Sequence, residues 1–344
     1  MEMTSRERVL TTLWLQEPDR VPYFELGVDR VLAQKLMGWK PGTTETVASV
    51  VRNPYTLEES KQIASYLGLD IISYFLRAPT YAQTEIGVGG IAFPVDGLIK
   101  TKADLAIIDL PDPNSDELYT EAMEFAENKG DYALAFVTRI GMLQTILCLG
   151  LENFALALYD NRGLVETLLD IYFDWMTVVV ENFCKIGFDL FITTDDFAYK
   201  SGMIFSPDIF RELMVPRYQQ VLEKVTIPWV LHSDGNISKV VDILIDLGVS
   251  GLHPNEKGAM DIRAMKRDYG DRICLMGNVD LNILGMGSPE EVDREVWELI
   301  RDVGPGGGYI LSSGNTLASY LKPECVLTMV DSVKRYGRYP IDLQ

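Results

Sequence analysis

The sequence predicts an α/β domain of the (β/α)8 TIM-barrel class that spans residues 1–344. Two observations favour a closed barrel over an open doubly wound sheet. Eight strand-like runs alternate with helix-like segments, and no GxGxxG motif follows an early strand. The length and the 47% hydrophobic content suffice to bury a large core. Two medium-sized domains are the alternative that length alone leaves open.

Each predicted strand is a short apolar or β-branched run bounded by turn residues. An N-terminal helical extension precedes the strands, because Thr4 and Ser5 offer an N-cap to an amphipathic segment that Pro18 ends. The eight predicted strands are Tyr23–Gly27, Leu69–Phe75, Tyr132–Val137, Asp189–Thr193, Trp229–His232, Ser250–His253, Ile273–Met276 and Tyr309–Ser312.

The helices between the strands begin at recognisable signals. Ser206-Pro207 and the capping box Ser288-Pro-Glu-Glu291 each open a helix. Residues 79–112 instead hold several Gly and Pro with short β-like pieces, so we expect a β-rich insertion near one mouth of the barrel. The other predicted helices are Leu57–Leu67, Ser115–Lys129, Met142–Ile186 with breaks near Gly150 and at Asn161–Gly163, Ile237–Leu247, Asp261–Tyr269 and Pro323–Tyr336.

Charge and cysteine content narrow the partners and the compartment. The 50 acidic residues outnumber the 31 basic ones, and the formal net charge of −19 would repel nucleic acid and anionic membranes. No hydrophobic segment follows the charged N-terminus, and no run approaches about 18 apolar residues, so we expect a cytoplasmic protein without a membrane span. Four cysteines lie far apart in apolar runs, as reduced thiols do: Cys148, Cys184, Cys274 and Cys325.

The functional residues are expected at the carboxyl ends of the strands, where TIM barrels carry their chemistry. Both histidines of the chain fall there, His232 in Leu231-His-Ser-Asp-Gly-Asn236 and His253 in Leu252-His-Pro-Asn-Glu256. Because neighbouring strands also end in polar residues, we predict one shared site. The residues assigned to catalysis are His232, Asp234, Asp195 and Asp196, and those assigned to substrate binding are His253, Asn278, Asn315, Glu25, Tyr74, Tyr81 and Phe93.

Structural roles remain the alternative for these residues. Helix caps and Asx-turns use Asp and Asn directly after a strand, and a histidine there is often simply hydrogen-bonded. A metal is a further candidate, because His and carboxylate ligands suit zinc. The candidate ligands are His232, Asp234 and Glu256, with Asp195 or Asp196 as another third ligand, although no CxxC or HExxH motif accompanies them.

At these residues the chain resembles the uroporphyrinogen decarboxylase superfamily, whose fold is a (β/α)8 barrel. It looks closest to the branch of corrinoid-dependent methyltransferases. The resemblance is strongest from about residue 186 to 337, and the N-terminal half is similar only in outline. The matching segments are Gly187-Phe-Asp189, Asp195-Asp196, Ser206-Pro207, Pro216, His232-Ser-Asp-Gly235, Gly277-Asn278 and the Gly-rich entry to the last strand.

Two departures indicate the branch. True decarboxylases of this superfamily carry an Arg-rich segment after the first strand, where this chain reads Phe24-Glu-Leu-Gly-Val-Asp-Arg30. The eight carboxylates of a porphyrinogen would therefore meet acidic side chains. The thiol-methylating branch has a His-x-Cys pair and a later Cys as zinc ligands, but Asp234 replaces the first Cys and Ser312-Ser313-Gly314 offers no later thiol. The pattern is more similar to methyltransferases that start O-demethylation.

This resemblance implies transfer of a methyl group from a small donor, such as an aryl methyl ether, to a Co(I) corrinoid. His232, with Asp234 or Asp195, would assist the leaving oxygen as an acid or as a metal ligand. Neither histidine lies in a cobalt-binding DxHxxG motif, since Val230 and Gly251 stand at its Asp position, so a separate carrier protein should supply the corrinoid. The alternatives are a cofactor-free uroporphyrinogen decarboxylase and a non-catalytic corrinoid- or metal-binding partner.

Overall fold

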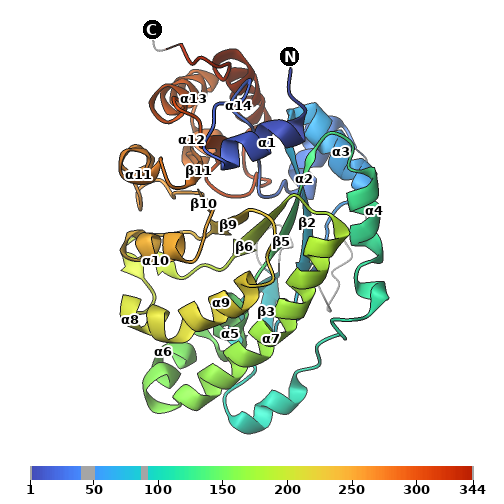
Figure 1. Cartoon of the computed structure of the whole chain (residues 1–344), viewed down its shortest axis with the longest axis vertical. Helices are drawn as coiled ribbons and strands as arrows, with labels where there is room; N and C mark the ends of the chain where they lie inside the picture. Colours follow the sequence, from blue (N-terminus) through green and yellow to red (C-terminus); the bar gives the residue numbers. More distant parts are fainter. Residues whose placement is uncertain (1, 40–50, 87–91, 343–344) are drawn as a thin grey trace.

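A computed structural model describes residues 2–39, 51–86 and 92–342, and it has a TIM-barrel-like α/β fold (Figure 1). Its main sheet has the strand order β1-β2-β5-β6-β9-β10-β11-β12. β1 (Val51–Arg52) pairs antiparallel with β2, and the other neighbours run parallel. The seven parallel strands are β2 (Ile71–Arg77), β5 (Ala133–Thr138), β6 (Leu190–Thr194), β9 (Trp229–His232), β10 (Gly251–His253), β11 (Cys274–Val279) and β12 (Tyr309–Ser313).

The segment around Tyr23 takes the place of the predicted first strand. Tyr23 forms a parallel bridge with Leu311 of β12, and its carbonyl accepts the Asp70 N–H at 2.8 Å just before β2. The segment thus connects the two outer parallel strands and closes the barrel. It makes a single bridge on the β12 side and no continuous ladder. Pro22, next to Tyr23, has no N–H to extend the pairing.

Helices cover the outside of the barrel (Figure 1). The predicted capping box is present, since the Ser288 hydroxyl accepts the Glu291 N–H and the Glu291 carboxylate accepts the Ser288 N–H. The predicted breaks separate α5, α6 and α7, whereas α2 was not predicted. The helices are α1 (Ser5–Leu13), α2 (Arg30–Met37), α3 (Leu57–Leu67), α4 (Thr120–Asn128), α5 (Met142–Leu149), α6 (Leu151–Asp160), α7 (Arg162–Ile186), α8 (Pro207–Ile209), α9 (Val215–Leu222), α10 (Val241–Asp246), α11 (Ile262–Tyr269), α12 (Leu281–Met286), α13 (Pro289–Val303) and α14 (Pro323–Tyr336).

Among the residues with described positions, no single helix has the length and apolarity needed to cross a bilayer. α5 and α6 meet those criteria only when taken together, and they are bent by 100° at their junction.

The predicted insertion contains an antiparallel pair of strands, β3 (Ala82–Ile86) and β4 (Ala92–Gly97). It is held against α5, because the Ile99 N–H donates to the Cys148 carbonyl at 2.9 Å. Gly97 is required at this contact, since a Cβ there would lie 2.1 Å from the Cys148 oxygen. The insertion therefore packs on the barrel wall through its backbone.

Alternate residues of the parallel strands face the barrel interior, as the two-residue period of a strand requires. In β5 these are Ala133, Ala135 and Val137, and they join one apolar cluster with Val9 and Leu13 of α1. Because α1 fills the amino-end mouth of the barrel, the opposite, carboxyl-end mouth is where the interior reaches the surface.

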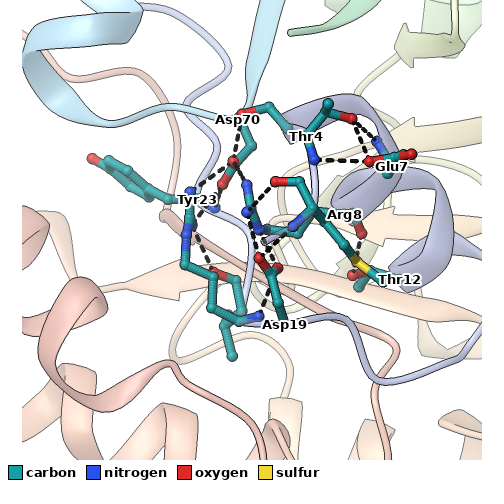
Figure 2. A network of polar contacts seen from close by, with 11 residues as sticks. Thr4, Glu7, Arg8, Thr12, Asp19, Tyr23 and Asp70 are labelled. Atoms are coloured by element: carbon teal, nitrogen blue, oxygen red, sulfur yellow. Dashed lines mark hydrogen bonds and ion pairs between the residues drawn. The ribbon is translucent and has the colours of Figure 1, made fainter. Parts of the chain in front are cut away.

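A buried ionic network fixes α1 at the amino-end mouth (Figure 2). Arg8, only 3% exposed, donates to Asp19 at 2.6 Å and to Asp70 at 2.7 Å. Arg20 binds both oxygens of Asp70 at 2.8 Å, and the Tyr23 N–H adds a further bond to that carboxylate. Each carboxylate in this network thus has cationic and backbone partners, as a buried charge needs.

Candidate active site at the carboxyl-end mouth

Strand register places the two histidines side by side. His232 is the register partner of His253 on β10 and of Thr194 on β6. Val230, two residues before His232, belongs to the apolar cluster inside the barrel, so the period of the strand turns His232 inward as well. Both imidazoles are buried, with exposures of 3% and 1%.

The two rings contact each other directly. The Nδ1 atoms of His232 and His253 are 2.6 Å apart, and Nε2 of His253 is 3.0 Å from the Ser312 hydroxyl. The Ser312 hydroxyl in turn donates to the Ser313 carbonyl. One hydrogen placement satisfies all three contacts: Ser312 accepts from Nε2–H of His253, whose Nδ1 accepts from His232. That arrangement leaves a lone pair on Nε2 of His232.

Two carboxylates lie beyond Nε2 of His232. This nitrogen is 3.8 Å from Oδ1 of Asp196 and 3.9 Å from Oδ1 of Asp234. Oδ2 of Asp234 accepts from the Asn315 amide at 2.8 Å, whereas the buried Oδ1 has no hydrogen-bond partner in the described chain. With side-chain exposures of 38% and 37%, the two carboxylates are the accessible part of the site.

In the acid–histidine cluster (Asp196, His232 and Asp234), electrostatics favour the neutral forms of Asp234 and His232. Burial, together with the neighbouring charges of Asp196 and Glu256, raises the pKa of Asp234 to about 7. Burial lowers the pKa of His232 and lowers that of His253 well below its usual value. Asp234 therefore holds a transferable proton near neutral pH, and the imidazoles are uncharged.

The cluster also fits a divalent cation. One donor atom from each of Asp196, His232 and Asp234 lies within 4.8 Å of the others. Two oxygens and an imidazole nitrogen are ligands that zinc accepts, and the unpartnered Oδ1 of Asp234 is available for such a bond. Glu256 does not complete this group. Its carboxylate accepts the Gly235 N–H at 2.7 Å and lies 3.3 Å from the Lys200 ammonium.

The structure places Asp195 outside the site, unlike the catalytic assignment made from the sequence. It is fully buried and turned away from the barrel interior, and its two oxygens accept the N–H groups of Ile140 and Leu143 at 3.0 Å. Burial raises its pKa to about 6. Because the strand period places Asp196 and Asp195 on opposite faces, Asp195 anchors the start of α5 and Asp196 belongs to the site.

Two aromatic residues assigned to the substrate wall lie elsewhere. Tyr74 points outward from β2 and is enclosed by Phe125, Phe183 and Phe188 in the core beneath the helices. The Tyr81 hydroxyl contacts the backbone of Asp109 and ties the insertion together. Both side chains therefore have structural roles. Phe93 belongs to β4, but its side chain lies outside the described part of the structure.

The remaining assigned residues occupy different places. Asn278 is 3% exposed and its amide donates to the Asn255 carbonyl, so its polar group is used structurally. Asn315 orients Asp234. Glu25 is buried, accepts from Tyr23 at 2.9 Å, and lines a cavity of about 400 Å³ that Arg77 also lines.

Two arginines at the same mouth were not anticipated from the sequence. Arg77 is the last residue of β2, and Arg139 directly follows β5. Phe75 and Val137 are register partners, so Arg77 and Arg139, two residues further on, continue the same inward-facing rows. The signal was available: both arginines follow the alternation of the predicted strands, but lie just beyond the predicted ends.

Fold and site together define a (β/α)8-type barrel with a histidine–carboxylate cluster at the carboxyl ends of its strands. The profile of the family described as Uroporphyrinogen decarboxylase (URO-D) matches residues 4–336. The chain therefore belongs to the uroporphyrinogen decarboxylase family.

Curated relatives in the family are distant. A uroporphyrinogen decarboxylase of Alkalilimnicola ehrlichii is 23% identical, over 97% of this chain and 94% of that protein. Its counterpart in Thioalkalivibrio sulfidiphilus is also 23% identical, over 70% of each chain.

Two solved structures share the fold. A methyltransferase from Methanosarcina mazei superimposes with a TM-score of 0.72 at 21% identity and covers 97% of this chain and 99% of its own. A B12-independent methionine synthase from Shewanella superimposes with a TM-score of 0.51 at 11% identity, over 81% of this chain and 86% of its own.

Proposed function

We propose that this protein is a methyltransferase that moves a methyl group from a small methylated donor, in the first instance an aryl methyl ether, to the Co(I) corrinoid of a separate carrier protein. The observation that carries this proposal is the acid–histidine cluster, in which the partly exposed carboxyl group of Asp234 has one buried oxygen without a partner. The fold shared with a methyltransferase supports it.

In this reaction the protein itself forms no covalent bond with the substrate. The Co(I) centre donates an electron pair to the methyl carbon, the carbon–oxygen bond breaks, and its electrons remain on the departing oxygen. Cobalt becomes Co(III) with a bound methyl group, and the phenolate must be stabilised or protonated. Asp234 is placed to supply the proton, since Asn315 holds its other oxygen and leaves Oδ1 facing the cluster.

A cation in the cluster would serve the same step. Asp196, His232 and Asp234 would hold it, and such an ion supplies Lewis-acid stabilisation of the leaving oxygen. The protein's own contribution is to fix the ring of His232 through His253 and Ser312, so that Nε2 faces the two carboxylates. Elemental analysis of purified protein distinguishes the two forms, because only the cation-bound form contains stoichiometric metal.

Spectroscopy tests the proposal. The protein is mixed with a Co(I) corrinoid protein and a panel of aryl methyl ethers, and the absorbance of methyl-Co(III) is followed. We expect activity in the wild type, its loss in His232→Ala and Asp234→Asn, and no change in Asp208→Asn. Asp208 is a suitable control, since its side chain is 90% exposed. Failure to form methyl-Co(III) across the panel would contradict the proposal.

Decarboxylation of a porphyrinogen is the second candidate. The names of the curated relatives favour it, although at 23% identity. Its test is anaerobic incubation with uroporphyrinogen followed by product analysis. Appearance of coproporphyrinogen would reverse the ranking, whereas methyl-Co(III) formation without it supports the methyltransferase.

A further inference from the structure

Two neighbouring guanidinium groups at the site have no hydrogen-bond or ion-pair partner in the described part of the chain, although that of Arg77 lies over the Phe75 ring, 5.4 Å from its centroid. Among residues with described positions, neither Arg77 nor Arg139 makes a side-chain hydrogen bond or an ion pair, and the Nε atom of each is buried and unsatisfied. This is unusual, because a buried polar atom normally has a hydrogen-bond partner. Arginines in such positions are generally paired, so a missing partner deserves an explanation from outside the chain.

The nearby carboxylates do not supply that partner. Asp195 and Asp196 act on both arginines through space, but no oxygen of either lies within ion-pair distance of a guanidinium. Asp195 already accepts two backbone N–H groups, and Asp196 accepts the Asp234 N–H at 3.0 Å. Each carboxylate is thus engaged in holding the backbone of the mouth.

The two arginines are close to each other and to the acid–histidine cluster. Burial is the main cause that lowers the pKa of Arg77 and of His232; the charge of Arg139 adds to the first shift, and the charges of both arginines add to the second. The register of β2 and β5 agrees, since it makes the two arginines neighbours on the mouth. An anion bound between them would therefore lie beside the acid–histidine cluster.

A cavity adjoins Arg77, the first of these two arginines. It measures about 400 Å³, within the usual range for small-molecule sites, and Arg77 lines it together with Leu26, Ile63 and Phe75. Its wall is mainly apolar. Of its charged side chains, Arg30 pairs with Glu59 at 3.0 Å, Asp29 caps α2, and burial raises the pKa of Glu25 to about 8, so Arg77 is the lining cation without an ion-pair partner. That combination suits an organic molecule with a hydrophobic body and one negatively charged end.

We propose that Arg77 and Arg139 bind a carboxylate of the methyl donor, so that the substrate is a methoxylated carboxylic acid and not a neutral ether. The inference rests on the proposed function only where it takes the bound molecule to be the methyl donor. The anion site itself does not depend on that function. Arginine suits this role because its planar fork forms paired hydrogen bonds with a carboxylate. In a chain of net charge −19, two local guanidiniums also provide the attraction that the rest of the surface lacks.

The test measures binding without any corrinoid. Benzoate and benzamide, which share a ring but differ in charge, are titrated into the protein by calorimetry. We expect benzoate to bind, with an affinity that falls as salt is added, and benzamide to bind more weakly. In Arg77→Gln and Arg139→Gln the affinity for benzoate should fall about 10-fold to 100-fold, as expected for loss of a charge-assisted hydrogen bond.

Control variants separate binding from folding. Arg267→Gln should leave benzoate binding unchanged, because the Arg267 side chain is 71% exposed and already pairs with Asp268 at 2.9 Å. Thermal unfolding of Arg77→Gln should show undiminished stability, since the change removes an unpaired buried charge. Equal affinities for benzoate and benzamide, an equal loss in Arg267→Gln, or tighter binding of inorganic phosphate than of benzoate would overturn the proposal.

The two proposals fail in different ways. If benzoate binds through the arginines and no methoxybenzoate yields methyl-Co(III), the anion site stands and the methyltransferase proposal falls. If anisole is demethylated as fast as 4-methoxybenzoate in both wild type and Arg77→Gln, the methyltransferase proposal stands and the carboxylate inference falls.

Discussion

Glu25→Gln tests the electrostatic account of the barrel interior most directly. Glu25 is 3% exposed and accepts hydrogen bonds from the Tyr23 hydroxyl at 2.9 Å and from the Ser313 N–H at 3.1 Å. These bonds favour the carboxylate, but burial outweighs them and raises the pKa of Glu25 from 4.5 to about 8. The folded protein thus keeps a proton on Glu25 that the unfolded chain releases.

The magnitude follows from linkage. The stabilising contribution of the raised pKa is fully present below pH 4.5 and is lost as the pH rises to about 8. Across that window the free energy of unfolding should fall by up to about 1.4 kcal/mol per pH unit, about 5 kcal/mol in total. Glutamine has nearly the same shape as the protonated side chain and cannot ionise, so the variant should lack this slope.

Denaturant unfolding at several pH values between about 5 and 8 measures the effect. The difference in unfolding free energy between Glu25→Gln and the wild type should increase with pH in favour of the variant. Other titrating groups cancel in this difference. Glu117→Gln, at an exposed position, is the matched control and should show no such trend. A flat difference for Glu25→Gln would refute the proposed protonation of the buried carboxyl.

Three further predictions concern residues away from the reacting atoms. Arg8→Met should lower the unfolding free energy by about 3 kcal/mol, because it leaves Asp70 buried with Arg20 as its main partner; a loss below about 1 kcal/mol in denaturant unfolding would contradict this. Asp195→Asn should cost about 2 kcal/mol, since an amide has one acceptor oxygen for two backbone N–H groups, and unchanged unfolding would argue against its anchoring role. Tyr74→Phe should cost about 1 kcal/mol and leave methyl-transfer kinetics unchanged, and an altered KM would place Tyr74 back in the site.

Much of the fold was predictable because strand and helix periods are local properties of the sequence. Six of the predicted strands are present within two residues at each end, β11 continues three residues beyond the predicted Met276, and the caps at Ser206 and Ser288 open helices as expected. The segment Tyr23–Gly27 differs, since its pairing depends on two strands distant in the sequence. Periodicity can identify a run of apolar residues, but it does not say how many ladder bonds that run will form.

The sequence predicted where the candidate site lies, but not all of the residues that form it. Asp195 and Asp196 are indistinguishable by composition, and only the alternation of β6 separates the buried anchor from the residue that faces the cluster. The same alternation places Tyr74 outward and Arg77 inward on β2. Arg77 was overlooked because the predicted strand ended at Phe75, two residues early. The contact between the Nδ1 atoms of His232 and His253 depends on tertiary register and had no local signal.

Both mouths of the barrel contain arginine and aspartate, but only at the amino-end mouth are these groups paired with each other. At the amino-end mouth, Arg8 and Asp70 are almost fully buried and are completely paired, as expected where charges serve only to hold α1 in place. At the carboxyl-end mouth, the Nε atoms of the half-buried Arg77 and Arg139 and Oδ1 of Asp234 are buried and have no hydrogen-bond partner within the described structure. A shortage of acidic residues does not explain this contrast, because the same chain provides enough partners for its arginines at the amino-end mouth. These unsatisfied groups are the observations on which both proposals rest: two guanidinium groups for a carboxylate of the donor, and Asp234 beside them for the leaving oxygen.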